Sequence, residues 1–276
     1  FEDGNITSWT EDTKKIIKRK INNKKLILVG SSMGGWIGLN LFKSVSLNFD
    51  TINNSQLNGI INLIPRKTQG FGISIAGTHG KSTTCAMCCH ALVHAGLAPS
   101  FIIGAEVPQL GGGSQVGTAK IPIGPMAGLP GLMVAEACEF NRSFHAHRPR
   151  HAAILNVEED HLDVYHNLKG VIQGFTEFAQ NIPDAQSGGR LLIAHDGAHR
   201  CEVTRSTNAR VETFGLSSEA DWSITFNVKT HEVYLQGPGP QLHWRNLMPG
   251  EHNALNAGAA AVLALWAGAD PTLVQE

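Results

Sequence analysis

The sequence predicts an α/β protein with a mostly parallel sheet and helices on both of its faces. Three observations favour this fold class. From residue 72 onward, short apolar runs alternate with segments of helical periodicity, as in strand–helix–strand units. A glycine-rich loop separates the first apolar run, 72–76, from the helix after it. Polar residues follow two later runs, at Glu136 and Asn156, and ligands bind parallel sheets at the carboxyl ends of their strands.

The composition limits what the chain binds. Its 276 residues are 42% hydrophobic and 16% charged, enough for one large or two small globular domains. With 22 basic and 23 acidic residues, the net charge of −1 argues against a nucleic-acid or anionic-membrane partner. No uncharged apolar run reaches the roughly 18 residues of a membrane span, and the first residues lack a signal-peptide pattern. We therefore expect a soluble, cytoplasmic protein.

The first elements of the chain carry a possible nucleophile motif. Isoleucines at helical spacing predict a surface helix over 10–21, and the apolar run 25–29 predicts a strand that enters Gly30-Ser-Ser-Met-Gly34. This strand, sharp turn and following helix resemble the nucleophile elbow of an α/β-hydrolase, which implies Ser32 as the nucleophile. Neither a His base nor an orienting acid can be placed for it, so a turn serine without chemistry is the alternative.

The polar stretch 65–70 interrupts the chain, and the sequence changes character after it. We therefore expect a domain boundary near residue 65. The segment 1–64 is then an incomplete α/β-hydrolase-like piece, and 65–276 is a second domain.

The second domain opens on a phosphate-loop pattern, Gly77-Thr-His-Gly-Lys-Ser-Thr83. Gly77 and Gly80 allow backbone N–H groups to turn toward an anion, Lys81 adds a positive charge, and Ser82 offers a hydroxyl to magnesium. Two residues, rather than the usual four, separate Gly77 from the Gly-Lys pair. An ordinary glycine turn before a helix is therefore the alternative to nucleoside-triphosphate binding.

A helix is expected over about 81–95, a strand over 101–104 and a Gly- and Pro-rich loop over 111–131. Three of the five cysteines fall in the helix, and the five form no even disulfide framework. Cys85-x-x-Cys88 is open to a redox or metal role, but no second pair stands at zinc spacing. Buried helix thiols in a reducing compartment are the favoured interpretation.

Two strands then carry polar residues to the carboxyl edge of the sheet. The run 131–135 predicts a strand that ends at Glu136, and 152–155 predicts one that ends at Asn156. The segment 159–163, Glu-Asp-His-Leu-Asp, follows the second strand. Together with the phosphate loop, these oxygen and nitrogen ligands suit divalent cations in phosphoryl transfer.

Residues 187–245 contain strand-like runs and predict sheet scaffold. The small-residue segment 249–260 then predicts a helix with His252, Asn253 and Asn256 near its start.

The sequence resembles the Mur ligase family over about residues 68–276, and the match is to the central, ATP-binding domain of that family. Four ordered motifs carry the resemblance: Gly77-Thr-His-Gly-Lys-Ser-Thr83, Glu136-Ala-Cys-Glu139, Asn156-Val-Glu-Glu-Asp-His-Leu-Asp163 and Gly250-Glu-His-Asn-Ala-Leu-Asn256. The first two are similar to the members that add L-alanine to UDP-N-acetylmuramate. Several other members use a modified lysine near the metals, and no lysine lies between Glu136 and Tyr165 here.

The resemblance implies an ATP-dependent amide-bond ligase of peptidoglycan precursor synthesis, with Mg²⁺, UDP-N-acetylmuramate and L-alanine as ligands. It implies that Lys81, Glu136 and His161 are catalytic. Lys81 would contact the β- and γ-phosphates, Ser82 and Glu136 would bind one magnesium ion, and His161 would help to hold a second. Asp160 or Asp163 would orient His161, although Asp163 as a helix cap is an equal alternative.

The resemblance also implies a nucleotide-binding set in which Asn156 supports its own segment and His252 and Asn256 approach the adenine. That set is Gly77, Thr78, His79, Gly80, Lys81, Ser82, Thr83, Asn156, His252, Asn253 and Asn256. Two neighbouring stretches leave alternatives open. Gly111-Gly-Gly-Ser114 would touch the sugar nucleotide or be a plain flexible loop. The histidines at 145, 147 and 151 suggest a metal cluster, but a solvated loop near the substrate is favoured.

Mur ligases have three domains, and the resemblance covers only the middle one. We therefore expect this chain to bind Mg-ATP weakly at best and not to complete ligation alone. A serine hydrolase acting through Ser32 and a non-catalytic ATP-binding module are the competing functions. Folylpolyglutamate and cyanophycin synthetases share the ligase architecture, so the choice of L-alanine rests on motif likeness.

Overall fold

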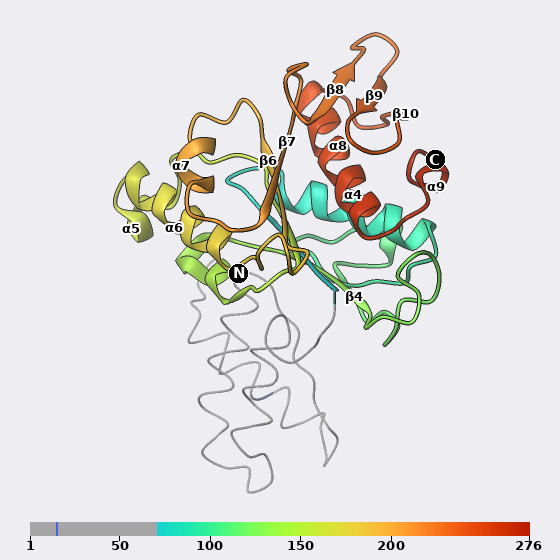
Figure 1. The fold of residues 1–276 in the computed structure, drawn as a ribbon, viewed down its shortest axis with the longest axis horizontal. Helices are drawn as coiled ribbons and strands as arrows, with labels where there is room; N and C mark the ends of the chain where they lie inside the picture. Colours follow the sequence, from blue (N-terminus) through green and yellow to red (C-terminus); the bar gives the residue numbers. More distant parts are fainter. Residues whose placement is uncertain (1–14, 16–70) are drawn as a thin grey trace, which may run out of the picture.

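The computed structural model describes Lys15 and residues 71–276 (Figure 1). The predicted segment 1–64, the elbow serine Ser32 and the boundary near residue 65 lie outside these described residues. Within them, one sheet has the strand order β10-β9-β8-β7-β6-β5-β1-β4-β2-β3. Its strands are β1 (Phe71–Ala76), β2 (Ser100–Ile102), β3 (Ser114–Gln115), β4 (Leu132–Glu136), β5 (His151–Ile154), β6 (Arg190–Ala194), β7 (Arg210–Gly215), β8 (Trp222–Phe226), β9 (Glu232–Gln236) and β10 (Leu242–Arg245).

The central strands, from β8 through β7, β6, β5, β1 and β4 to β2, all pair in parallel. Strand β3 closes one edge in an antiparallel pair, and β9 and β10 form an antiparallel extension at the other edge. The predicted mostly parallel sheet is therefore confirmed. The extension appears as the orange arm at the top of Figure 1.

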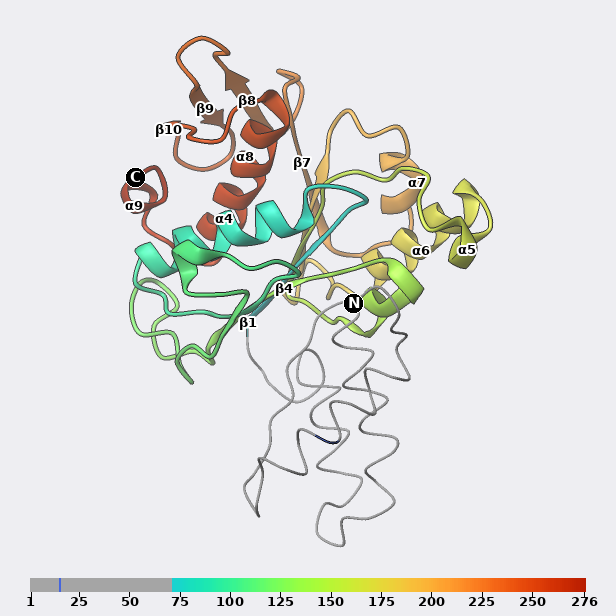
Figure 2. The same cartoon turned by 180° about the vertical axis from the view of Figure 1, so that it is seen from behind.

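Helices cover both faces of the sheet. They are α4 (Lys81–His94), α5 (Leu162–Tyr165), α6 (Leu168–Gln180), α7 (Arg200–Thr204), α8 (Glu251–Trp266) and α9 (Pro271–Val274), with short 3₁₀ segments η1 (Pro108–Leu110) and η2 (Phe140–Ala146). Helices α4, α8 and α9 pack into one hydrophobic cluster, and α5, α6, α7 and η2 pack into a second. Figure 2 shows α4 and α8 side by side, apart from the group formed by α5, α6 and α7.

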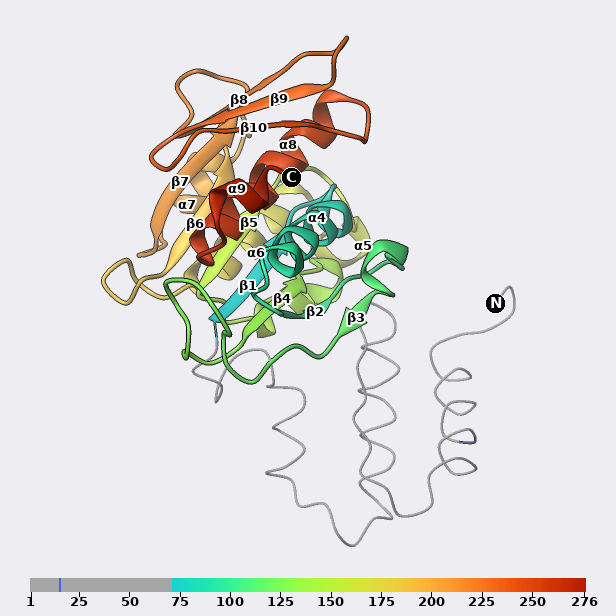
Figure 3. The same cartoon turned by 90° about the vertical axis from the view of Figure 1, so that its right-hand side faces the viewer.

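Side chains at alternate positions of the strands contribute to the two hydrophobic clusters in turn. In β5, Ala152 and Ile154 belong to the α6 side, whereas Ala153 belongs to the α4 and α8 side. Successive side chains of a strand point to opposite faces, so a strand covered on both sides needs apolar residues at every position. Figure 3 shows α4, α8 and α9 in front of the strands, on one side of the sheet.

Small residues bring α8 close to the sheet. A Cβ on Gly258 would lie 2.3 Å from Cδ1 of Ile224 in β8, so any larger residue there would require the Ile224 side chain to move. On the other face, α6 buries Val171, Phe175 and Phe178 at helical spacing. We made no prediction for residues 168–180, although this apolar spacing is the signal that identifies a helix.

The segment between β2 and β4 is largely irregular, as predicted, but it contains η1, β3 and a bridge between Lys120 and Pro130. Cys85, Cys88 and Cys89 are fully buried free thiols in α4, which confirms that they are buried helix thiols. Across the described part of the chain, no helix has the length and apolarity needed to traverse a bilayer.

Candidate functional site

The loop between β1 and α4 adopts a conformation that only glycine accommodates. Gly77 has φ 138° and Gly80 has φ 82°, in the region that favours glycine. A Cβ on Gly77 would lie 3.0 Å from Cβ of Leu155, and a Cβ on Gly80 would lie 2.6 Å from Oδ1 of Asn256. The loop therefore fits closely between the end of β5 and helix α8, and it leads into the N-terminus of α4, where backbone N–H groups favour an anion.

Asn156, directly after β5, holds this loop in place. Its Oδ1 accepts a hydrogen bond from the backbone N–H of His79 at 2.7 Å, and its Nδ2 donates to the His79 carbonyl at 3.1 Å. Two residues further on, the N–H of Glu158 donates to Oγ1 of Thr78 at 2.9 Å. Asn156 thus forms a reciprocal pair of hydrogen bonds with the backbone of the phosphate loop, rather than with its own segment.

Lys81, the first residue of α4, folds back over the loop. Its Nζ donates to the carbonyl oxygens of Gly77 at 2.7 Å and Thr78 at 3.0 Å. It also donates to Oε1 of Glu139 at 3.0 Å and lies 2.9 Å from the other carboxylate oxygen. The side chain of Glu139 is 2% exposed, so this is a buried ion pair. All three ammonium protons of Lys81 are used within the protein.

Ser82 and Glu136 form a second polar pair beside the loop. The Ser82 hydroxyl donates to Oε2 of Glu136 at 2.9 Å, and the backbone N–H of Gly104 donates to the same oxygen at 2.6 Å. Neighbouring hydroxyl and carboxylate oxygens are the ligands that magnesium prefers. The parallel pairing of β1 with β4 brings these residues together, because Ile75 is in register with Glu136.

His161 lies on the other side of Glu139. Its Nε2 is 3.7 Å from Oε1 of Glu139 and 3.8 Å from Oδ2 of Asp160. The backbone N–H of His161 also donates to Oδ1 of Asp160 at 2.7 Å. Ligand atoms of Glu139, Asp160 and His161 all lie within 4.8 Å of one another, an arrangement able to hold a cation. Asp163 is exposed in the first turn of α5, which has no side-chain cap, so Asp160 is the carboxylate beside His161.

The segment that carries Glu139 is strained and anchored. Asn141 and Arg142 have φ values of 52° and 55°, in the left-handed region that costs a non-glycine residue about 1–3 kcal/mol. The Tyr165 hydroxyl donates to the Glu139 carbonyl at 2.6 Å, and burial raises the pKa of Tyr165. The Phe140 ring packs edge-on against His161, with centroids 5.0 Å apart. These contacts fix Glu139 between Lys81 and His161.

Helix α8 contributes one of its three predicted residues to the loop. Oδ1 of Asn256 lies directly over Gly80. The side chain of Asn253 instead donates to the Pro249 carbonyl at 2.7 Å and is 8% exposed, so it braces the start of its own helix. His252 is exposed in the first turn of α8.

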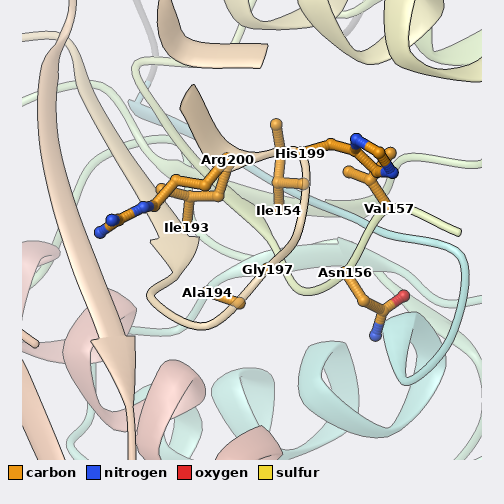
Figure 4. Close-up of a pocket in the computed structure, with 8 residues that line it drawn as sticks. All are labelled: Ile154, Asn156, Val157, Ile193, Ala194, Gly197, His199 and Arg200. Carbon is orange, nitrogen blue, oxygen red and sulfur yellow. The ribbon is translucent and has the colours of Figure 1, made fainter. Parts of the chain in front are cut away.

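A hollow lies beside Asn156 at the carboxyl ends of β5 and β6 (Figure 4). Its lining residues are Ile154, Asn156, Val157, Ile193, Ala194, Gly197, His199 and Arg200. Among these, only Asn156 belongs to the predicted set. The hollow thus extends the ligand edge of the sheet from the phosphate loop toward β6.

The histidines near residue 150 do not form a metal cluster with one another. His147 Nδ1 lies 2.9 Å from Oγ of Ser74, and His145 Nε2 lies 2.9 Å from the Gly174 carbonyl. His151 is 4% exposed at the start of β5. The favoured prediction of a solvated loop was wrong for His147 and His151. The His147 ring contacts Ser74 in strand β1, and the His151 ring is buried in the core. Burial lowers the pKa of His147 to about 4 and that of His151 to about 3.

Comparison with known proteins decides the family. The sequence model described as the Mur ligase middle domain matches residues 75–264. The chain belongs to the Mur ligase family.

Among curated Mur ligases, the UDP-N-acetylmuramate–L-alanine ligase of Caldanaerobacter subterraneus subsp. tengcongensis is 31% identical over 240 residues, which cover 85% of this chain and 48% of that protein. The enzyme of the same name from Desulfitobacterium hafniense is 35% identical over 210 residues, covering 74% of this chain and 43% of that protein. The chain therefore spans less than half the length of these relatives.

A solved Mur ligase shares the fold. It is the UDP-N-acetylmuramate:L-alanyl-γ-D-glutamyl-meso-diaminopimelate ligase from Neisseria meningitides, with a TM-score of 0.66 and 23% identity. The match covers 86% of this chain and 73% of that one. At this identity the likeness establishes the architecture alone.

In this Mur ligase chain, Glu139 is the residue that sequence reasoning missed. It belongs to the quoted Glu136-Ala-Cys-Glu139 motif, but we assigned it no role. A second carboxylate three residues after Glu136, on a loop at the ligand edge, was the available signal. Its burial beside Lys81 depends on the path of η2, which the sequence pattern did not predict.

Proposed function

We propose that residues 65–276 form the ATP-binding domain of a ligase that joins L-alanine to UDP-N-acetylmuramate. The observation that carries this proposal is the convergence of Lys81, the Ser82–Glu136 pair and His161 around one phosphate loop. The names of the curated relatives support the two substrates. We propose separately that residues 1–64 are a distinct, hydrolase-like segment.

The loop supplies what a triphosphate needs. The N-terminus of α4 presents backbone N–H groups and positive potential, and the Lys81 ammonium adds a positive charge. Asn256 reaches the loop from α8, and His252 lies one turn earlier on the same helix, toward the expected position of the base. In this assignment, Asn156 fixes the loop and contacts no phosphate.

The donor set also fits magnesium. Ser82 and Glu136 would hold one ion, and His161 with Glu139 and Asp160 would hold a second. The buried Oε2 of Glu139 accepts no hydrogen bond and lies 2.9 Å from Nζ of Lys81, so it would become available to a cation once Lys81 turns to the phosphate. Bound magnesium would neutralise charge on the phosphates. Asp160, beside His161, would keep its ring oriented.

The proposed reaction has two steps. A carboxylate oxygen of UDP-N-acetylmuramate attacks the γ-phosphorus of ATP, and ADP leaves to give an acyl phosphate. The amine of L-alanine then attacks the acyl carbon, phosphate leaves and the amine loses a proton. Lys81 would stabilise the charge that develops on the phosphoryl oxygens, because preorganised cations lower the barrier of such transfers.

Calorimetry of ATP in the presence of Mg²⁺ tests the binding assignment. Removing one charge-assisted contact of about 1.5–3 kcal/mol should weaken ATP binding by about 10–150-fold in Lys81→Ala. Glu136→Ala should weaken binding only when Mg²⁺ is present. The matched control is Lys229→Ala, an exposed lysine in the turn between β8 and β9. Equal affinity for Lys81→Ala and Lys229→Ala would overturn the assignment.

Phosphate release separates a ligase from a nucleotide-binding module. Release that requires both UDP-N-acetylmuramate and L-alanine supports the ligase, as does the formation of an amide product. Because we expect no complete ligation from this chain alone, absence of release does not decide between the two functions. Phosphate release that needs neither UDP-N-acetylmuramate nor L-alanine would contradict the ligase.

A further inference from the structure

Lys81 makes its complete set of contacts without a ligand. Its three donors reach two loop carbonyls and Glu139, and its side chain is 12% exposed. A phosphate group that binds Lys81 must therefore replace at least one of these partners. The carbonyls of Gly77 and Thr78 belong to the loop itself, so Glu139 is the partner on a separate segment.

The carboxylate of Glu139, unlike the ammonium group of Lys81, has an atom without a hydrogen bond. This carboxylate is 2% exposed, and Lys81 is the one cation in direct contact with it among the described residues. Oε2 accepts no hydrogen bond, although it lies 2.9 Å from Nζ of Lys81. On the opposite side, Nε2 of His161 is 3.7 Å away from Oε1. The carboxylate thus lies between a lysine and a group of potential cation ligands.

The loss of Lys81 to a phosphate would leave a buried carboxylate without a counter-charge. Such a state costs several kcal/mol unless another cation takes the place of the lysine. We propose that Glu139 is a positioning residue that couples nucleotide binding to divalent-cation binding, by exchanging Lys81 for the cation. This inference rests on the proposed function, because it assumes that Lys81 binds phosphate.

The exchange has a reciprocal consequence. Without nucleotide, Lys81 holds Glu139 and keeps the cation out. With nucleotide, Glu139 is free to accept it. Because coupling between two ligands is mutual, a divalent cation must strengthen nucleotide binding by the same factor by which nucleotide strengthens cation binding.

The first test measures the affinity for ATP with and without Mg²⁺, by calorimetry. In Glu139→Gln, Lys81 is no longer held by a charge, so binding of metal-free ATP tightens while the benefit of Mg²⁺ shrinks. Coupling between ligands is typically about 5–150-fold, and we expect the ratio of the two dissociation constants to fall by about tenfold. Glu139→Asp keeps the charge and retains most of the coupling. Glu219→Gln, which removes an exposed carboxylate in the turn between β7 and β8, leaves the ratio unchanged.

The second test needs no nucleotide. Mn²⁺ binding, followed by its electron paramagnetic resonance signal, should become tighter in Lys81→Met than in the unmodified chain, since Glu139 has lost its lysine. The double variant Lys81→Met with Glu139→Gln should lose this gain. A general loss of structure would weaken Mn²⁺ binding in both variants, so the sign of the change distinguishes exchange from damage.

The outcomes separate the two proposals. If the unmodified chain binds no ATP with or without Mg²⁺, the proposed function and this inference both fail. If it binds Mg-ATP but Glu139→Gln leaves the coupling ratio intact, the exchange alone is wrong. Mn²⁺ affinity that is unchanged or weaker in folded Lys81→Met likewise overturns the exchange and leaves nucleotide binding standing.

Discussion

Two buried glutamates lie in different regions of the sheet and have contrasting surroundings. Glu139, at the carboxyl edge, is 2% exposed and pairs with Lys81. Glu212, in β7, is 4% exposed and has a partner for each oxygen. Its Oε1 contacts Arg190 and lies 2.9 Å from Nε of Arg210, and its Oε2 accepts from the indole N–H of Trp222 at 2.8 Å.

The difference lies in how completely each carboxylate is satisfied. A buried charge with good geometry and no unused lone pairs gains nothing by changing partners. Arg190 is further held by stacking over Trp266, with its guanidinium carbon 4.2 Å from the ring centroid. Glu139 has an oxygen without a hydrogen bond and a histidine close by. The comparison indicates that Glu212 fixes the fold, whereas Glu139 is arranged to exchange its partner.

Removal of Glu212 should have the largest effect on stability. Breaking a buried ion pair from one side costs about 3–5 kcal/mol, because it leaves an uncompensated charge. We expect Glu212→Ala to lower the free energy of unfolding by about this amount in urea denaturation, with ATP affinity unchanged under folding conditions. Glu232→Ala, at a partly exposed glutamate 3.8 Å from His243, should cost less than about 1 kcal/mol. A Glu212→Ala variant that is stable but defective in ATP binding would reverse the comparison.

Acid should lower the free energy of unfolding through His151, at the start of β5. Burial holds its folded pKa at about 3, below the unfolded value of about 6.5. Above pH 6.5 the ring is neutral in both states. Between these two pKa values only the unfolded chain gains the proton, so the free energy of unfolding falls by about 1.4 kcal/mol for each unit of decreasing pH.

Urea denaturation at pH 7, 6 and 5 measures this dependence. His147, with a pKa lowered to about 4, contributes with the same sign. His151→Asn should reduce the slope, whereas His243→Asn, at an exposed ring, should leave it unchanged. Equal slopes in both variants would mean that His151 is not the buried neutral group.

A matched pair of glycines should give the smallest effect. Gly80 and Gly111 both have left-handed φ values, 82° and 76°. A Cβ on Gly111 meets nothing within 4 Å, whereas one on Gly80 would lie 2.6 Å from Oδ1 of Asn256. Both alanine variants should lose about 1 kcal/mol of stability from backbone strain, and Gly80→Ala should lose more because of its contact with Asn256. Only Gly80→Ala should also weaken ATP binding, as measured by calorimetry.

The added substitution Asn256→Ala should relieve the contact and recover part of the stability that Gly80→Ala loses beyond Gly111→Ala. No recovery in the double variant would show that the approach of α8 does not constrain the loop.

Much of the architecture was predictable because it depends on local patterns. The helix expected over about 81–95 is α4, and the strand expected over 152–155 is β5. The strand before Glu136 and the loop at Gly77–Thr83 also lie where periodicity and glycine placement indicated. Helix α6 was not predicted, although its apolar residues follow helical spacing, and the strands within 187–245 were expected only as scaffold.

The candidate site was predictable in its residues but not in its contacts. Lys81 and Glu136 carry recognisable chemistry for their positions, and motif spacing is enough to single them out. Asn253 is an asparagine one turn before Asn256 on the same helix. Its side chain nevertheless donates a hydrogen bond to the Pro249 carbonyl. Spacing along a helix places residues near one another but does not decide which way each side chain turns.

The sequence by itself determined the strand–loop–helix unit, the alternation that produces a parallel sheet and the residue types at the ligand edge. These depend on interactions within a few residues. Only the tertiary structure decided that Glu139 pairs with Lys81 and that Asn256 closes over Gly80. Those contacts depend on the order β5-β1-β4 and on the packing of α4 against α8, and both are set by burial between segments far apart in the chain.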